Sequence, residues 1–124
     1  MSVVPGNTCW IDLTAVGNHL HVVLSYPTDE GKVLVANLTT YRGKSHEDVS
    51  CILSVGDHPD ITHESWVVYD NAKLYDSAYL LKIGLADSLT PIALARVLDG
   101  AMQGDRIKMS HYELLRDQGL IETD

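Results

Sequence analysis

Short stretches of alternating apolar and polar residues, separated by turn-forming residues, occupy the first seventy positions of this chain. Successive side chains of a β-strand point to opposite faces, so this alternation predicts strands that each bury one face. We expect five such strands, over residues 8–14, 19–26, 32–40, 49–55 and 65–70. The segment 75–81 fits either a further strand or a turn of helix, and its pattern leaves both open.

The third of these segments, residues 32–40, differs from the others. Its sequence KVLVANLTT is almost continuously apolar. An unbroken apolar run of strand length is typical of a strand that is covered on both faces. We therefore expect residues 32–40 to be the central strand.

Two helices are predicted after the strands. Thr90 and Pro91 form a start signal, and apolar residues then recur at helical spacing until Gly104. Ser110 and Glu113 have the spacing of a capping box and predict a second, short helix. Strands followed by helices favour an α+β fold, mostly β, with a small barrel and C-terminal helices. The length of 124 residues suits one domain over residues 1–124.

Composition limits the classes of function. Nine basic against 17 acidic residues give a formal net charge of −8, which opposes broad attraction to nucleic acid. The absence of a long apolar run or a signal-peptide pattern predicts a soluble, cytoplasmic protein without a membrane partner. Cys9 and Cys51 lie apart in apolar stretches and are expected to be buried, reduced thiols.

The order and spacing of these segments are similar to those of the MazF/PemK family of toxin-antitoxin ribonucleases. Gly6-x-x-Cys9-Trp10-Ile11-Asp12-Leu13 resembles the family's opening strand, and residues 17–25, GNHLHVVLS, resemble its second strand. Residues 35–40, VANLTT, resemble its third strand. The resemblance covers about residues 6–103. It implies an SH3-like (MazF/PemK/CcdB-like) barrel.

The same resemblance implies an activity and partners. The family cleaves single-stranded RNA without metal or other cofactor, and a small antitoxin protein inhibits it. We also expect a two-fold homodimer, both from the resemblance and because residues 32–40 present apolar side chains on two faces.

Carried across by position, the catalytic pair of the family becomes His19 and Thr39. The family has arginine where this chain has His19. The permanent positive charge that stabilises the phosphate in the transition state must therefore come from another residue, and Arg42 or Lys44 is the candidate. An antiparallel hairpin through residues 27–31 would bring His19 and Thr39 side by side. His21 shares the face of His19 and either supports it or faces solvent.

The remaining candidates lie in loops or at strand ends, where binding residues concentrate. Gly56-Asp57-His58-Pro59 together with His63 forms either a site with two imidazoles and a carboxylate or a tight turn in which Asp57 binds backbone N–H groups. We take His58 as a third catalytic candidate and expect the substrate to be bound by His21, Thr40, Arg42, Lys44 and His63. The spacing of Cys51, His58 and His63 does not fit zinc, so no metal is expected.

The resemblance thus implies an endoribonuclease. A barrel of the same fold without catalytic activity, acting as a protein-binding or nucleic-acid-binding regulatory module, is the alternative, and the missing arginine and the net charge favour it. Fold alone does not distinguish the two.

Overall fold

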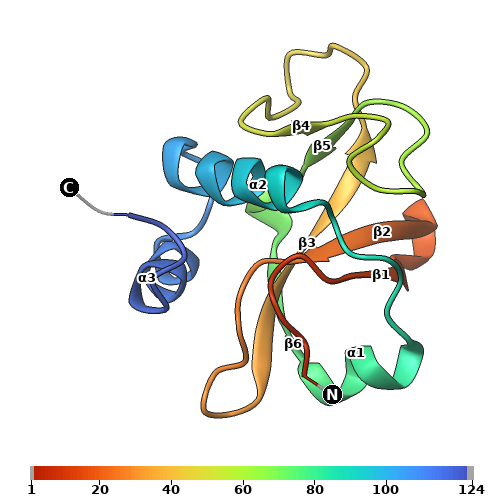
Figure 1. The fold of residues 1–124 in the computed structure, drawn as a ribbon. Coiled ribbons are helices and arrows are strands. Elements are labelled where there is room, and N and C mark those ends of the chain that lie inside the picture. The colour runs from red at the N-terminus through yellow and green to blue at the C-terminus, as the bar shows by residue number, and fades with distance from the viewer. Residues whose placement is uncertain (1, 123–124) are drawn as a thin grey trace.

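A six-stranded antiparallel sheet built around the apolar segment 32–40 organises the fold (Figure 1). The computed structural model describes residues 2–122. Its strands are β1 (Thr8–Asp12), β2 (Asn18–Val23), β3 (Lys32–Thr40), β4 (Ile52–Leu53), β5 (Ser65–Val67) and β6 (Lys73–Asp76). Its helices are α1 (Ser77–Ile83), α2 (Pro91–Gln103) and α3 (Met109–Asp117), with 3-10 helices η1 (Thr14–Val16) and η2 (Tyr69–Asn71). The α+β class is confirmed.

The strand order is β1-β2-β3-β5-β4, with β6 also paired to β3. β3 is long enough to serve three partners, because β2 pairs with one of its edges while β6 and β5 follow one another along the other. The ends of this order, β1 and β4, do not pair with each other within residues 2–122. The sheet is therefore open over this part of the chain.

The core lies on both faces of β3. Leu34, Ala36 and Leu38 belong to a large apolar cluster that includes residues of α2 and α3, and α2 and α3 lie together on one side of the sheet in Figure 1. Val33 and Val35 belong to a second cluster that includes residues of β1, β2 and α1. The prediction of a strand covered on both faces is confirmed. Residues of the same chain cover both faces of β3, so its apolar side chains are not available for contact with a second copy.

The start of α2 follows from its sequence signal. The Thr90 hydroxyl accepts a hydrogen bond from the Ala93 N–H at 3.2 Å, and Pro91 occupies the first helical position. The capping box predicted for the last helix is wrong. α3 already begins at Met109, so Ser110 lies inside its first turn, and no side chain caps the helix. None of the helices in the described part of the chain is long and apolar enough to cross a membrane.

The first, second and fifth predicted strands end earlier than expected, at Asp12, Val23 and Val67, and two further segments differ more. The fourth strand covers only Ile52–Leu53, and Val49 and Val55 are exposed on either side of it. The Ser50 N–H donates to the Asp48 carboxylate, so it is not available for pairing with a neighbouring strand. The ambiguous segment contains both alternatives, since β6 runs directly into α1 and Gly84, at φ +96°, ends that helix.

Candidate functional site

The end of β3 divides the predicted residues between two faces of the sheet. Thr39 lies opposite Trp66 and Thr40 opposite Ser65 in the ladder with β5. Because neighbouring side chains in a strand alternate, Thr39 faces the same side as Asn37, whereas Thr40 faces the other side with Leu38. The structure therefore holds two separate groups of candidates, which we call the Thr39 face and the Thr40 pocket.

His19 lies on the Thr39 face, where β2 and β3 come to the end of their pairing. The ladder places His21 opposite Asn37, and His19 and Thr39 each lie two residues further toward the same end. The strands are antiparallel as predicted, and His19 Nδ1 lies 2.9 Å from the carbonyl oxygen of Leu38, the neighbour of Thr39. His19 Nε2 lies 3.1 Å from the carbonyl oxygen of Val16. A neutral imidazole has a donor at one ring nitrogen only, so it can donate to only one of these two oxygens.

A chain of amides fixes the Thr39 hydroxyl. Asn71 donates to Asn37 Oδ1 at 3.2 Å, and Asn37 Nδ2 lies 3.4 Å from Thr39 Oγ1, a long contact. The first contact leaves the amide group of Asn37 free to donate to Thr39, so the Thr39 oxygen accepts and its proton is free to be donated elsewhere. Sequence reasoning missed Asn37 and Asn71, because their contact joins β3 to η2 and has no local signature.

His21 is buried rather than exposed. It is 3 % exposed, its ring meets the Tyr75 ring edge-on, and its Nδ1 donates to the carbonyl oxygen of His19 at 2.8 Å. Burial lowers the pKa of His21 below its ordinary value, although the hydrogen bond to His19 opposes this. His21 thus supports His19 from inside the protein and does not reach a substrate directly. The solvent-facing alternative is wrong.

The buried His21 predicts a loss of stability in mild acid. The unfolded chain binds a proton on this residue from about pH 6.5 downward, whereas the folded protein resists it because its pKa is lower. The free energy of unfolding should therefore fall as the pH drops below about 6.5. Urea unfolding at pH 7.5 and 5.5 measures the fall, which His21→Gln should reduce and the exposed-site control His63→Gln should leave intact. An equal fall in wild type and His21→Gln would contradict this assignment.

The loop after β3 presents Arg42 and Lys44 to solvent around a buried carboxylate. Glu47 accepts from the Arg42 N–H at 3.0 Å and from the Lys44 N–H at 2.8 Å. Burial alone would raise the pKa of Glu47, but these N–H donors outweigh it and the pKa lies below its usual value. Glu47 and Asp48 are both buried. The carboxylate holds the loop backbone while the two cationic side chains remain exposed.

The same loop carries an imidazole to the Thr39 face. The His46 ring meets the Trp66 ring edge-on, with centroids 6.4 Å apart, and Trp66 is the cross-strand neighbour of Thr39. Arg106 donates to the His46 carbonyl oxygen at 2.7 Å and ties this loop to the segment after α2. His46 is itself exposed, whereas Trp66 is buried.

The Thr40 pocket brings together two of the predicted binding residues, Thr40 and His63. It is a cavity of about 170 Å³ on the face opposite Thr39. Its lining comes from β1, β2, β3 and the segment before and into β5, and consists of Trp10, Leu20, Leu38, Thr40, Asp60, Ile61, Thr62, His63 and Ser65. Sequence reasoning missed Trp10 and Asp60 as site residues.

His58 is a buried structural residue within the loop that precedes β5. It is 2 % exposed, its Nδ1 accepts from the Asp60 N–H at 3.0 Å, and its Nε2 lies 2.6 Å from the Asp87 carbonyl oxygen and 2.9 Å from the Thr8 hydroxyl. Both nitrogens are engaged, so His58 joins the loop to β1 and the segment before α2. His58 lines a cavity of about 450 Å³, but both of its ring nitrogens already have hydrogen-bond partners within the protein.

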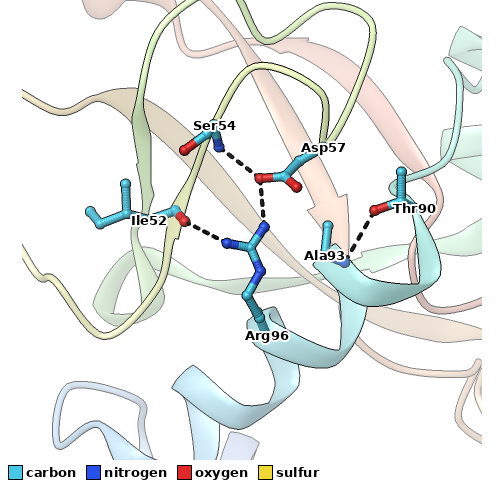
Figure 2. Close-up of polar contacts among 6 residues, drawn as sticks. All are labelled: Ile52, Ser54, Asp57, Thr90, Ala93 and Arg96. Carbon is cyan, nitrogen blue, oxygen red and sulfur yellow. Dashed lines mark hydrogen bonds and ion pairs between the residues drawn. The ribbon is translucent and has the colours of Figure 1, made fainter.

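Figure 2 shows how α2 fixes the same loop. Asp57 accepts from the Ser54 N–H at 2.7 Å and pairs with Arg96 of α2 at 2.6 Å, while Arg96 also reaches the carbonyl oxygen of Ile52. The interpretation of Asp57 as a turn residue that binds backbone N–H groups is confirmed. These contacts of α2 hold the loop for which the sequence also allowed a site with two imidazoles and a carboxylate.

Metal and thiol chemistry have little support in the geometry. Within residues 2–122, no group of three or more His, Cys, Asp or Glu side chains is placed to hold a metal ion. Cys9 and Cys51 are buried and free, as predicted, and burial raises the pKa of each to about 11. Both thiols are therefore protonated at neutral pH and unreactive.

The candidate chemistry thus lies in His19, Thr39 and their neighbours on one face, and in the Thr40 pocket on the other. Comparison with known proteins adds no assignment to this geometry. No protein-family model matches the chain, and a search of curated proteins finds no significant relative.

Proposed function

We propose that this protein is a metal-independent endoribonuclease of the MazF/PemK type, which cleaves single-stranded RNA in the cytoplasm and is neutralised by a small antitoxin protein. One observation carries the proposal. The His19 ring and the Thr39 hydroxyl, the two groups at the family's catalytic positions, lie on one face where β2 begins and β3 ends. His19 and Thr39 are both partly exposed.

The fold supports the same proposal. A sheet of order β1-β2-β3-β5-β4, with β6 running along β3 after β5, is compatible with an SH3-like barrel that is open between β1 and β4. The proposal includes a two-fold homodimer. Its interface would not use β3, which is covered, but the exposed apolar residues of β6 and α1, which are Leu74, Tyr79, Leu81 and Ile83.

The proposed reaction uses the 2′-hydroxyl of the RNA as nucleophile. Its oxygen attacks the adjacent phosphorus, the bond from phosphorus to the 5′-oxygen breaks, and a 2′,3′-cyclic phosphate and a 5′-hydroxyl are formed. His19 Nε2 takes the 2′-proton after its exposed contact with Val16 is released, while Nδ1 stays bonded to Leu38 and orients the ring. The Thr39 hydroxyl, oriented by Asn37, donates to a phosphate oxygen.

Two further groups complete this chemistry. His46, held near Thr39 through its contact with Trp66, supplies the proton to the departing 5′-oxygen. Arg42 supplies the permanent positive charge that the family takes from the arginine at the position of His19. Its backbone N–H bond to Glu47 fixes the start of the loop from which the guanidinium extends.

The products of cleavage test the mechanism. We expect RNA fragments that end in a 2′,3′-cyclic phosphate, formed at the same rate with and without EDTA, because the substrate supplies its own nucleophile. Mass spectrometry of the fragments identifies the ends. Cleavage that disappears in EDTA and returns with a divalent ion would overturn the proposal and indicate metal catalysis.

A specific observation favours the second candidate, a non-catalytic binding module of the same fold. Both ring nitrogens of His19 face backbone carbonyl oxygens, and arginine is absent from that position. A protein in which His19 only joins β2, β3 and η1 would have these contacts without catalysis. Purified protein that leaves labelled RNA intact, yet binds a partner protein through the Thr39 face, would support this second function.

A further inference from the structure

The Thr40 pocket has the size of a site for one small ring system. Its volume of about 170 Å³ is well below the 300–1,000 Å³ of sites that hold drug-sized ligands or cofactors. Leu20, Leu38 and Ile61 give it apolar walls, and hydroxyl groups and one carboxylate provide polar atoms. We propose that this pocket binds a single unstacked guanine base of the RNA substrate, an inference that rests on the proposed function and names its specificity.

Trp10 provides the surface on which a base can stack. It lies in β1 opposite Leu20 and remains 44 % exposed, so part of its ring is accessible to a ligand. Stacking of a base on an aromatic side chain stabilises the bound base and tolerates any base. Trp10 therefore explains why a base enters the pocket, but not which base.

Asp60 selects the base. Its Oδ2 lies 3.4 Å from the indole Nε1 of Trp10, and Oδ1 has no hydrogen-bond partner among the described residues. An ionised carboxylate only accepts hydrogen bonds, so it prefers a base edge with two adjacent N–H donors. Guanine has such an edge in N1–H and its 2-amino group. Adenine and cytosine place a ring acceptor beside their amino group, and uracil flanks its N–H with two carbonyl oxygens.

The charge of the pocket favours a base over a phosphate. Asp60 is an acid within a protein of net charge −8, and no lysine or arginine lines the cavity. Thr40 adjoins Thr39 in β3 but faces the other side of the sheet. A strand of RNA that passes over the end of β3 would place a guanine in the pocket and the neighbouring phosphate near Thr39 and His19.

The test is a titration of the full chain with GMP, IMP and AMP, followed by the indole N–H signals in a two-dimensional NMR spectrum. The Trp10 signal reports on the pocket, and Trp10→Phe identifies it. IMP carries the same phosphate as GMP but lacks the 2-amino group. Since a bidentate pair contributes about 1–3 kcal/mol of discrimination, GMP should bind roughly tenfold or more tightly than IMP or AMP.

Asp60→Asn should remove this preference, because the amide offers a donor in place of one acceptor. Asp60 is exposed, so the substitution should not disturb folding, and Asp29→Asn, at another exposed acid in the turn before β3, is the matched control. Equal binding of GMP, IMP and AMP, or an unchanged preference in Asp60→Asn, would overturn the guanine site.

The outcome separates the two proposals. GMP selectivity in a protein that cuts no RNA would leave the guanine site standing and remove the ribonuclease. Cleavage of RNA by a protein without GMP selectivity, at sites with no guanine preference, would remove the guanine site and leave the ribonuclease standing.

Discussion

Replacing His19 by alanine is expected to lower the turnover of single-stranded RNA by about 100-fold or more, the usual scale for the loss of a general acid or base. The proposed reaction needs a group to remove the 2′-proton, and His19 is the partly exposed imidazole at the family's catalytic position beside Thr39. Single-turnover cleavage of a labelled RNA measures the effect. A thermal melt is needed beside it, because the substitution also removes the ring's contacts with Leu38 and Val16.

A matched variant distinguishes catalysis from binding. Arg42→Ala should weaken RNA binding and reduce the dependence of binding on salt, because it removes one phosphate contact. Its side chain is exposed, so the fold should be retained. A well-folded His19→Ala protein that cuts RNA as fast as wild type would exclude His19 as the catalytic group.

Gly100→Ala is expected to destabilise the protein by about 1–3 kcal/mol, as overpacking of a filled core does. A Cβ atom at this position would lie 2.6 Å from the Tyr69 hydroxyl, 2.8 Å from the Ser50 carbonyl oxygen and 2.9 Å from Cys51 Cβ. The Tyr69 hydroxyl cannot move freely, because it donates to the Val97 carbonyl oxygen at 2.5 Å from a fully buried position. α2 would have to shift away from the sheet.

Helix propensity alone predicts that Gly100→Ala would stabilise the protein. Alanine in a helix interior is about 1 kcal/mol more favourable than glycine, so by this measure a glycine inside α2 lowers the stability of the helix. Urea unfolding decides between the two, with the exposed neighbour substitution Asp99→Ala as the control that should keep or slightly raise stability. A Gly100→Ala protein as stable as wild type would show that the helix can move without cost.

Site residues were predictable only where local position implied their environment. The antiparallel arrangement of the strands carrying His19 and Thr39 followed from the hairpin between them. The burial of His58 could not be foreseen, because its partners Thr8 and Asp87 come from distant segments. The Asn71–Asn37 contact and the pocket between Trp10 and His63 escaped prediction for the same reason.

The sequence by itself determined the elements whose signals are local. The apolar run predicted β3 over its full extent, Thr90 and Pro91 fixed the start of α2, and isolation in apolar stretches predicted buried thiols at Cys9 and Cys51. Periodicity and capping act between neighbours within a few residues, so they can be recognised in the chain alone.

Only the tertiary structure decided which polar groups remain accessible and which close contacts the core tolerates. His19 and His21 are two residues apart on one strand, yet only His19 reaches solvent, because Tyr75 of β6 packs against His21. Gly100 is required because Tyr69 and Ser50 come within contact of α2 from other segments. Such contacts depend on strand register and on how layers pack, which no local pattern encodes.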